Sequence, residues 1–225
     1  MLVKNWMTKD VITLTPERSM MKAAKLMKDK EISRLPIVDD EGVLVGIVSD
    51  RDIKEASPSK ATTLDMHELY YLLSEIKLKD IMSRKVLTVS IEDTVEKAAV
   101  VLDENKIGGI PVVDAENKCV GIITNTDVFR VLINITGVLH GGVQMGLALS
   151  NKAGSLSLVI DFLKENKARV MSVLTSYEPN QENTRQVFIR IMDMEKSELN
   201  KLREGIDKNF NLLYWVRDSV HGLTS

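Results

Sequence analysis

The hydrophobic and polar positions of this 225-residue chain follow one pattern twice. Each copy predicts a short strand, a helix with a 3.6-residue apolar period, two apolar strands around a polar turn, and a final short helix. Residues 7–53 align with residues 82–128 without a gap, at a constant offset of 75, with 16 identities in 47 positions. Because unrelated sequences match at roughly one position in fifteen, this repeat organises the first part of the chain.

The elements of the two copies are expected at equivalent places. The first strands are predicted at residues 11–14 and 86–89, and the helices that follow have Ser19 and Thr94 as N-caps. The turns between the apolar strands are predicted at residues 40–42 and 115–117. Since these strands are almost wholly apolar, we expect them to be buried on both faces. The last helices are expected to begin near Asp52 and Asp127.

The rest of the chain has a different pattern. An amphipathic helix is predicted over residues 63–76, between the copies, and residues 135–142 are predicted to form a linker. After it, the pattern predicts the order β-α-β-β-α-β, an α+β sandwich of the ferredoxin-like kind. Strands are expected at residues 145–149, 169–174, 186–191 and 212–216, with helices at 155–166 and 196–208. The predicted domains are repeat 1 (1–57), a helical linker (58–77), repeat 2 (78–134), a linker (135–142) and a C-terminal domain (143–225).

Composition narrows the class of protein. The net charge is −2 and the pI about 6.0, so no basic surface for nucleic acid is predicted. A single cysteine, Cys119, excludes an internal disulfide and is expected to be a buried, unreactive thiol. No apolar run reaches the roughly 18 residues of a membrane span and no signal peptide is evident, so we expect a cytoplasmic protein without membrane contact.

Catalytic and metal-binding motifs are not found in the sequence. The histidines, at positions 67, 140 and 221, show no metal-ligand spacing, and no G-x-x-x-x-G-K-[ST] phosphate loop occurs. We therefore predict no catalytic residues, no metal and no enzyme activity.

The polar residues at the strand ends are the candidate chemistry. Ser49 and Asp52, like Thr124 and Asp127, lie where an apolar strand meets a helix. A carboxylate can accept both hydroxyls of a ribose, and a hydroxyl beside a helix start suits a phosphate or ribose oxygen. The side chains of Ile47 and Ile122 could line a slot for a flat base. The alternative is that both aspartates only cap the last helix, and the motif alone does not decide between the two.

These residues carry a resemblance to a known family. The pattern Met7-Thr8, Thr13-x-x-Pro16, residues 35–39 and residues 45–52 resembles a CBS domain, and the second copy matches it except that Ile91 replaces Pro16. The resemblance covers about residues 1–134. It implies a tandem CBS pair, or Bateman module, of two β-α-β-β-α repeats around a pseudo-twofold axis. The two clefts of such a pair bind AMP, ADP or ATP, and sometimes S-adenosylmethionine or a nicotinamide dinucleotide.

The resemblance also implies which residues bind the ligand. One cleft is expected around Ile47, Ser49 and Asp52, and the other around Ile122, Thr124 and Asp127. Further expected contacts are Ile32, Ser33, Arg34, their counterparts Ile107, Gly108 and Gly109, and the cations Lys9 and Arg84. Arg34 would suit a phosphate. Because Gly109 takes its place in the second copy, the clefts are expected to differ in affinity.

The C-terminal domain resembles an ACT domain. Asn151 and Gly154, followed by Leu156, match the first turn of that family, although its Asp and Pro are missing. ACT domains pair side by side and bind small effectors, often amino acids, so effector binding and dimerisation alone are both possible roles. RNA-binding domains share the ferredoxin-like fold, but they need aromatic residues on the third strand, where only Phe188 occurs. The order CBS–CBS–ACT is similar to acetoin-utilisation-type CBS–ACT proteins.

The sequence as a whole predicts a regulatory sensor without catalytic activity. Its ligand is expected to be an adenine nucleotide or S-adenosylmethionine, and its partners a second copy of the chain, in a homodimer, and an unidentified regulated protein. The alternative is a structural or interaction scaffold whose clefts no longer bind a ligand.

Overall fold

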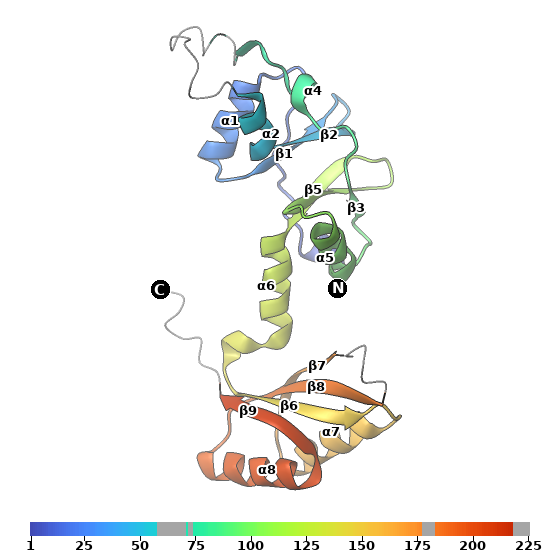
Figure 1. Cartoon of the computed structure of the whole chain (residues 1–225), viewed down its shortest axis with the longest axis vertical. Helices are drawn as coiled ribbons and strands as arrows, with labels where there is room; N and C mark the ends of the chain where they lie inside the picture. The colour runs from blue at the N-terminus through green and yellow to red at the C-terminus, as the bar shows by residue number, and fades with distance from the viewer. Residues whose placement is uncertain (58–70, 72–73, 177–182, 218–225) are drawn as a thin grey trace. The chain divides into compact units, whose positions relative to one another are not determined.

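Figure 1 shows the computed structural model, which describes all residues except 58–70, 72–73, 177–182 and 218–225. The chain divides into two compact units, Met1–Val128 and Phe129–Ser225, which we describe separately. The predicted helix over residues 63–76 lies largely outside the described residues, as do His67 and His221.

The first unit contains the first repeat and the second repeat as far as Val128, in the first turn of its last helix. The first repeat comprises α1 (Met20–Asp29), β1 (Arg34–Val38), β2 (Leu44–Ser49) and α2 (Asp50–Ala56). The second comprises β3 (Val89–Ser90), α5 (Val95–Glu104), β4 (Gly109–Val113), β5 (Cys119–Thr124) and α6 (Asn125–Thr136). A 3-10 turn, η1 (Val3–Asn5), and a short helix, α4 (Leu78–Ile81), precede the two repeats. The predicted N-caps are confirmed, because the hydroxyls of Ser19 and Thr94 accept the backbone N–H of Lys22 and Lys97.

The paired strands repeat with the offset seen in the sequence. β1 and β2 are antiparallel with Pro36 opposite Ile47, and β4 and β5 are antiparallel with Pro111 opposite Ile122. The helices bury their apolar face against these strands. Fully buried side chains of the two cores include Met20, Leu35, Ile37, Ile110 and Ile123. Burying a side chain of this size contributes roughly 1.5–3 kcal/mol.

The prediction of equal first strands is wrong for the first repeat. In the second repeat β3 pairs in parallel with β4, and the N–H of Ile91 donates to the carbonyl of Val113 at 3.4 Å. In the first repeat the described residues form a single bridge at this place, between Leu14 and Ile37. Pro16 stands at the position of Ile91 and has no N–H to continue the ladder. In the second repeat, too, the strand is shorter than the predicted 86–89, because residues 86–88 run past the sheet without pairing.

The prediction that all four apolar strands are buried on both faces is wrong for β2 and β5. β1 and β4 are almost fully buried, whereas β2 alternates between buried and half-buried residues along its length. In β5 the half-buried face holds Ile122 and Thr124. One face of each second strand is therefore available to line a cavity. The helices α2 and α6 also begin two residues before the predicted positions, at Asp50 and Asn125.

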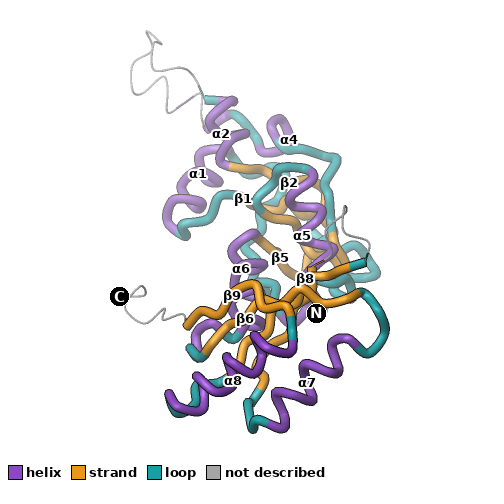
Figure 2. The backbone as a smooth tube through the Cα atoms, turned by 60° about the horizontal axis from the view of Figure 1, so that its bottom comes forward, coloured by secondary structure: helices purple, strands orange, loops and turns teal. Residues whose placement is uncertain are grey.

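The second unit contains a four-stranded antiparallel sheet. After η2 (Val138–His140) its elements are β6 (Val143–Ser150), α7 (Ser155–Glu165), β7 (Val170–Ser176), β8 (Thr184–Ile191), α8 (Lys196–Asn209) and β9 (Asn211–Arg217). The strand order is β7-β8-β6-β9. Both helices cover the same face, where Leu163 and Leu202 join Met145 and Ile189 in one core, and Figure 2 shows α7 and α8 side by side over the sheet.

The opposite face of this sheet carries an aromatic pair. Phe188 and Tyr214 stack with ring centroids 6.3 Å apart, and Tyr214 packs closely over Gly146. The predicted linker is bound to the sheet by hydrogen bonds from Ser172 to the carbonyl of Thr136 and from Arg190 to the carbonyl of Gly141, at 3.0 and 3.2 Å. These bonds hold the residues before β6 against the sheet of the second unit.

Candidate functional site

The second strand of each repeat pairs with a segment that comes before the other repeat in the sequence. Thr8 forms two backbone hydrogen bonds with Ile122 of β5, at 2.9 and 3.0 Å. Ser83 forms the equivalent pair with Ile47 of β2, both at 3.0 Å. The segments before the repeats are thus exchanged across the unit. As a result, a cavity beside β2 or β5 has walls from both repeats.

A glycine allows the close approach at each exchanged segment. A Cβ atom on Gly46 would lie 2.5 Å from the sulfur of Met82, and one on Gly121 would lie 2.5 Å from the sulfur of Met7. Real Cβ atoms essentially never show a contact that short, so a larger residue would displace the methionine side chain at either position. At Gly121 it would also press on the backbone carbonyl of Thr8, at 3.0 Å. The glycines of the repeated Val-Gly-Ile sequence therefore have a packing role next to the clefts.

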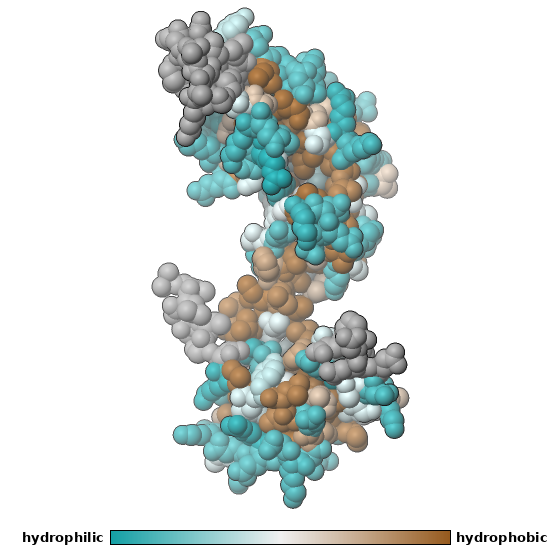
Figure 3. All heavy atoms as spheres, in the orientation of Figure 1, coloured by the Kyte–Doolittle hydropathy of each residue, from teal (hydrophilic) through white to brown (hydrophobic). Residues whose placement is uncertain are grey.

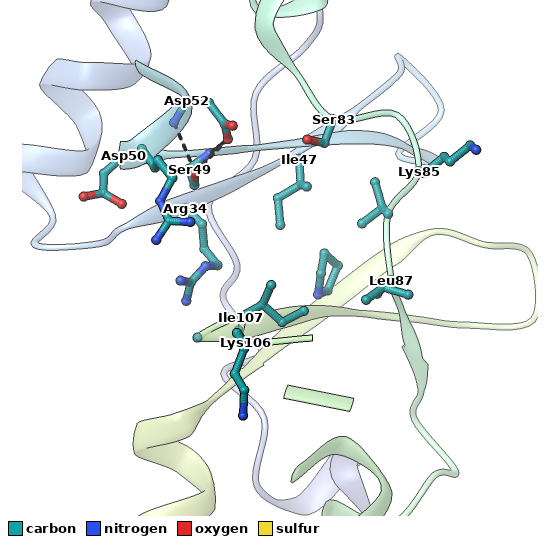
Figure 4. A pocket seen from close by; sticks show the side chains of 15 residues that line it. Arg34, Ile47, Ser49, Asp50, Asp52, Ser83, Lys85, Leu87, Lys106 and Ile107 are labelled. Atoms are coloured by element: carbon teal, nitrogen blue, oxygen red, sulfur yellow. Dashed lines mark hydrogen bonds between the residues drawn. The ribbon is translucent and has the colours of Figure 1, made fainter. Parts of the chain in front are cut away.

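The first cleft, which we call the Ser49 cleft, has a volume of about 390 Å³. Its walls come from the end of β2 and the start of α2 on one side, and from the exchanged segment and the residues before β4 on the other. It is lined by Arg34, Ile47, Ser49, Asp50, Arg51, Asp52, Ser83, Lys85, Val86, Leu87, Lys106, Ile107, Gly108, Gly109 and Pro111. This volume lies within the range of small-molecule sites. In Figure 4, Ile47, Leu87 and Ile107 face one another across the apolar part of the cleft.

Ser49 and Asp52 form a reciprocal cap at the start of α2. The backbone N–H and the hydroxyl of Ser49 both donate to Oδ2 of Asp52, each at 2.7 Å, and the N–H of Asp52 lies 3.3 Å from the Ser49 oxygen. The capping alternative is therefore realised in the structure. Capping does not exclude ligand binding, because Asp52 and Ser49 both also line the cleft.

Arg34 extends from β1 onto the second repeat, as Figure 4 shows. A Cβ atom on Gly108 would lie 2.9 Å from one guanidinium nitrogen, and one on Gly109 would lie 2.7 Å from the other. The two glycines thus make room for the arginine. Burial lowers the pKa of the Arg34 guanidinium, and the nearby Asp50 carboxylate opposes that shift. An ordinary arginine titrates far above neutral pH, so the side chain presents a partly desolvated cation to a ligand.

The second cleft, the Thr124 cleft, has a volume of about 560 Å³. It is lined by Thr8, Asp10, Val11, Ile12, Glu31, Ile32, Ser33, Arg34, Gly108, Ile122, Thr124 and Thr126. Nearly all of these residues have an equivalent that lines the Ser49 cleft, at a distance of 75 positions in the sequence. Arg34 and Gly108 line both clefts.

Thr124 and Asp127 repeat the cap of the first repeat. The N–H and the hydroxyl of Thr124 donate to Oδ2 of Asp127 at 2.9 and 2.7 Å. Asp127 is only 3% exposed and is not among the described residues that line the cleft. The two predicted aspartates therefore differ in their access to a ligand.

The predicted residues fall into two groups. The structure gathers Ile47, Ser49, Asp52, Arg34 and Gly108 in the Ser49 cleft, and Ile122, Thr124, Ser33, Arg34 and Gly108 in the Thr124 cleft. Ile107 and Gly109 line the former and Ile32 the latter. Lys9 and Arg84 are not among the described residues that line either cleft, and Arg84 donates to the carbonyl of Lys79 at 3.4 Å.

Sequence reasoning missed the charged residues at the rims of the clefts. Lys85 and Lys106 line the Ser49 cleft, and Asp10 and Glu31 line the Thr124 cleft. Asp10 and Lys85 come directly after the cations that were predicted, Lys9 and Arg84. Which side chain of each pair enters the cleft depends on the backbone path after Thr8 or Ser83. The pattern of residue types did not predict that path.

The remaining predicted chemistry lies elsewhere. Asn151 and Gly154 form the turn before α7, where the Asn151 N–H donates to the carbonyl of Asn183 at 2.9 Å and Gly154 has a φ of 84°. Cys119, which was predicted to be buried, is half-buried in the structure, and burial raises the pKa of its thiol. Within the described ranges, no group of three or more His, Cys, Asp or Glu side chains could hold a metal ion. None of the described helices is long and apolar enough to cross a membrane.

Comparison with known proteins gives a consistent result for the first unit. The CBS-domain family profile matches residues 3–59 and 78–134. A CBS domain-containing protein of Dictyostelium discoideum is 31% identical over 134 residues, which are 60% of this chain and 92% of that protein. For several other curated relatives, the chain spans only about a quarter of their length.

Two solved structures are also similar. CBSX2 of Arabidopsis thaliana, solved in complex with AMP, is 34% identical with a TM-score of 0.50, over 60% of this chain and 97% of that one. AcuB of Vibrio cholerae is 32% identical with a TM-score of 0.52, over 61% of this chain and 94% of that one.

Proposed function

Because the chain belongs to the CBS-domain family, we propose that it is a non-catalytic regulatory sensor that binds adenosine-containing ligands in its two clefts. AMP, ADP, ATP and S-adenosylmethionine are the candidate ligands. The first unit supplies the binding sites, and the second unit supplies dimerisation or a second effector site. A ligand can act on this protein only through its different affinity for two arrangements of the chain.

The Ser49 cleft is the single observation that carries the proposal. It combines an apolar slot, a hydroxyl–carboxylate pair and cations within one cavity of about 390 Å³. A purine ring fits between the side chains of Ile47, Leu87 and Ile107. The free lone pairs of Asp52 can accept ribose hydroxyls, since a carboxylate has about four acceptor positions and the Ser49 cap occupies Oδ2.

The cations of the same cleft suit a phosphate group. Arg34 offers a planar fork of donors, and Lys85 and Lys106 lie at the rim. Hydrogen bonds between charged groups are roughly twice as strong as neutral ones. The AMP complex of CBSX2, a relative with 34% identity, supports an adenine nucleotide as the type of ligand.

Calorimetric titration of the full chain with AMP, ADP, ATP and S-adenosylmethionine tests this proposal. We expect at least one of them to bind, and Asp52→Asn to weaken binding in the Ser49 cleft roughly ten- to a hundredfold, because a charge-assisted hydrogen bond is lost. Asp161→Asn is the matched control, since Asp161 is an exposed residue of α7 in the second unit.

The fold of each variant is verified by its circular dichroism and thermal midpoint. If a folded native chain binds none of the four ligands, the sensor proposal is wrong and the scaffold alternative replaces it. Chromatography of the nucleotides after long incubation tests the absence of catalysis, and the release of any product would contradict it.

For the second unit we propose a ferredoxin-like, ACT-like domain. The order β6-α7-β7-β8-α8-β9, the sheet order β7-β8-β6-β9 and the placement of both helices on one face support this assignment. An amino-acid effector would bind near the turn that contains Asn151 and Gly154. Thermal-shift screening of the full chain with the twenty amino acids tests this role, and a uniform absence of stabilisation would leave dimerisation alone.

The proposed homodimer has support from α6. Phe129, Leu132 and Ile133 of this helix are 63%, 50% and 41% exposed, and Figure 3 shows hydrophobic residues gathered where Figure 1 labels α6. Exposed apolar patches of this kind mark interaction sites. Sedimentation equilibrium of the full chain should give twice the chain mass, and Phe129→Glu with Leu132→Glu should shift it toward the monomer. A native chain that sediments as a monomer would contradict the dimer.

A further inference from the structure

The two clefts have equivalent walls but opposite rim charges. Lys85 in the Ser49 cleft corresponds to Asp10 in the Thr124 cleft, and Lys106 corresponds to Glu31. Arg51 of the first cleft corresponds to the neutral Thr126 of the second. Because each pair is separated by the repeat offset of 75, the charged residues occupy equivalent positions in the walls of the two cavities.

The carboxylates of the Ser49 cleft do not cancel its positive charge. Its described lining holds four cations, which outnumber the two carboxylates, Asp50 and Asp52. Asp50 also forms an exposed pair with Lys54, outside the lining, at 2.8 Å. Asp52 is engaged by the N–H and hydroxyl of Ser49. Lys106 pairs with Asp103 at 3.1 Å, but both side chains are about 80% exposed, and such pairs are weak and easily exchanged. Arg34, Arg51, Lys85 and Lys106 thus leave an excess of positive charge.

The Thr124 cleft has the reverse balance. Within the part of the chain that the structure describes, no salt bridge neutralises Asp10 or Glu31. Arg34 is the one cation in its described lining, and this residue is shared with the Ser49 cleft. The nearby Asp127 adds a further carboxylate behind Thr124. A phosphate in this cleft would share one cavity with the carboxylates of Asp10 and Glu31, and like charges in one site repel.

We propose that the two clefts select ligands of opposite charge. The Ser49 cleft takes an adenine nucleotide through its phosphate, and the Thr124 cleft takes a nucleoside-type ligand that has no phosphate and is neutral or cationic. This inference rests on the proposed binding of adenosine-containing ligands. Like charges at a site reject the wrong partner as effectively as opposite charges attract the right one.

Two probes with one nucleoside test this selection on the full chain. AMP is a dianion near neutral pH, and 5′-amino-5′-deoxyadenosine carries a single positive charge at the same 5′ position. In titration calorimetry we expect each probe to bind one site per chain. Each should still bind when the other is saturating, because the two clefts share only Arg34 and Gly108 among their described lining residues.

Charge variants identify the clefts. Asp10→Lys with Glu31→Lys should give the chain a second AMP site and weaken the amino-nucleoside roughly ten- to a hundredfold. Lys85→Asp with Lys106→Glu should remove AMP binding from the Ser49 cleft. Asp29→Lys with Glu55→Lys makes the same change in net charge as the first variant, at exposed residues that do not line either cleft, and should leave a single AMP site.

The outcomes separate this inference from the function on which it rests. Two equal AMP sites on the native chain, competition between the probes for one site, or AMP binding without amino-nucleoside binding would each overturn the charge selection and leave the sensor standing. A folded chain that binds neither probe would overturn both. The selection would be established if the native chain had one site for each probe, if the Asp10→Lys, Glu31→Lys variant gained a second AMP site and bound the amino-nucleoside more weakly, and if the control variant behaved like the native chain.

Discussion

The two repeats of the first unit differ far more in their clefts than in their cores. Leu35 and Ile110 are equivalent and both fully buried. Ser19 and Thr94 cap equivalent helices through the same hydrogen bond. By contrast, equivalent positions at the clefts carry opposite charges. Lys85 of the Ser49 cleft is equivalent to Asp10 of the Thr124 cleft, and Lys106 is equivalent to Glu31.

This difference shows at which positions the two copies of a duplicated fold can diverge in chemistry. A buried position is constrained by close packing, so both copies need an apolar residue of similar size there. A half-exposed position at a cleft is solvated in either copy, and a charge of either sign costs little stability. The chemistry of the two sites can therefore differ while the scaffold remains the same.

The strongest test of the shared scaffold is the truncation of equivalent core residues. Leu35→Ala and Ile110→Ala should each lower the free energy of unfolding by about 2–5 kcal/mol, through lost burial and a new cavity. The two losses should be similar, and urea denaturation measures them. Leu158→Ala, at a 65% exposed position, is the control and should change stability by less than about 0.5 kcal/mol. A large loss at one position and none at the other would show that the repeats are not equivalent in their cores.

The glycines beneath the exchanged segments should show an intermediate effect. Gly121→Ala should destabilise the chain by about 1–3 kcal/mol, because the new Cβ would also approach the backbone carbonyl of Thr8, at 3.0 Å. Gly46→Ala should cost less, since its three nearest atoms all belong to the side chain of Met82. Equal losses in thermal and urea unfolding would contradict this asymmetry.

The sequence predicted the repeated scaffold well, for a physical reason. The helices, the buried strands and the N-caps follow from local periodicity and hydroxyl placement, which residues 19–29 and 94–104 display directly. The strand-end pairs Ser49–Asp52 and Thr124–Asp127 were also visible, because the members of a capping box lie three positions apart in the sequence.

The rims of the clefts were not predictable in the same way. Lys85 and Asp10 reach the cavities only because the segments that contain them cross to the other repeat. That exchange is a long-range contact, which no local pattern encodes. The half-buried faces of β2 and β5 were missed for the same reason, since an apolar strand looks alike whether its second face meets a core or a ligand cavity.

The unequal first strands permit a smaller test. Ile91→Pro should remove the bond from its N–H to Val113 and lower the free energy of unfolding by about 1 kcal/mol. Pro16→Ile in the first repeat supplies the missing donor and should be close to neutral. Amide hydrogen exchange at Val113, in the strand that pairs with β3, measures the local effect, and unchanged protection in Ile91→Pro would mean that the ladder does not depend on this bond.

The smallest expected effect is the dependence of stability on pH. It arises from one aspartate–lysine pair in each repeat, and the two pairs lie at different places in the repeats. Hydrogen bonds from Lys54 and Lys97 lower the pKa values of Asp50 and Asp93, respectively. The equivalent positions hold Asn125 and Arg18, so each repeat has one such pair at a different place. An aspartate whose pKa is lowered by folding stabilises the protein above its unfolded pKa of about 3.9, and this contribution disappears as the pH falls through the lower folded pKa.

Because both pairs are of the exposed i,i+4 type, each should contribute only about 0.3–0.5 kcal/mol near neutral pH. Asp50→Asn and Asp93→Asn should lower the thermal midpoint slightly at pH 7, and the difference from the native chain should vanish below about pH 3. Added salt should reduce the same difference, since these charges are solvated. A deficit that persisted undiminished in acid would mean that the aspartates act through shape or neutral hydrogen bonds, and that the pairs with Lys54 and Lys97 add nothing.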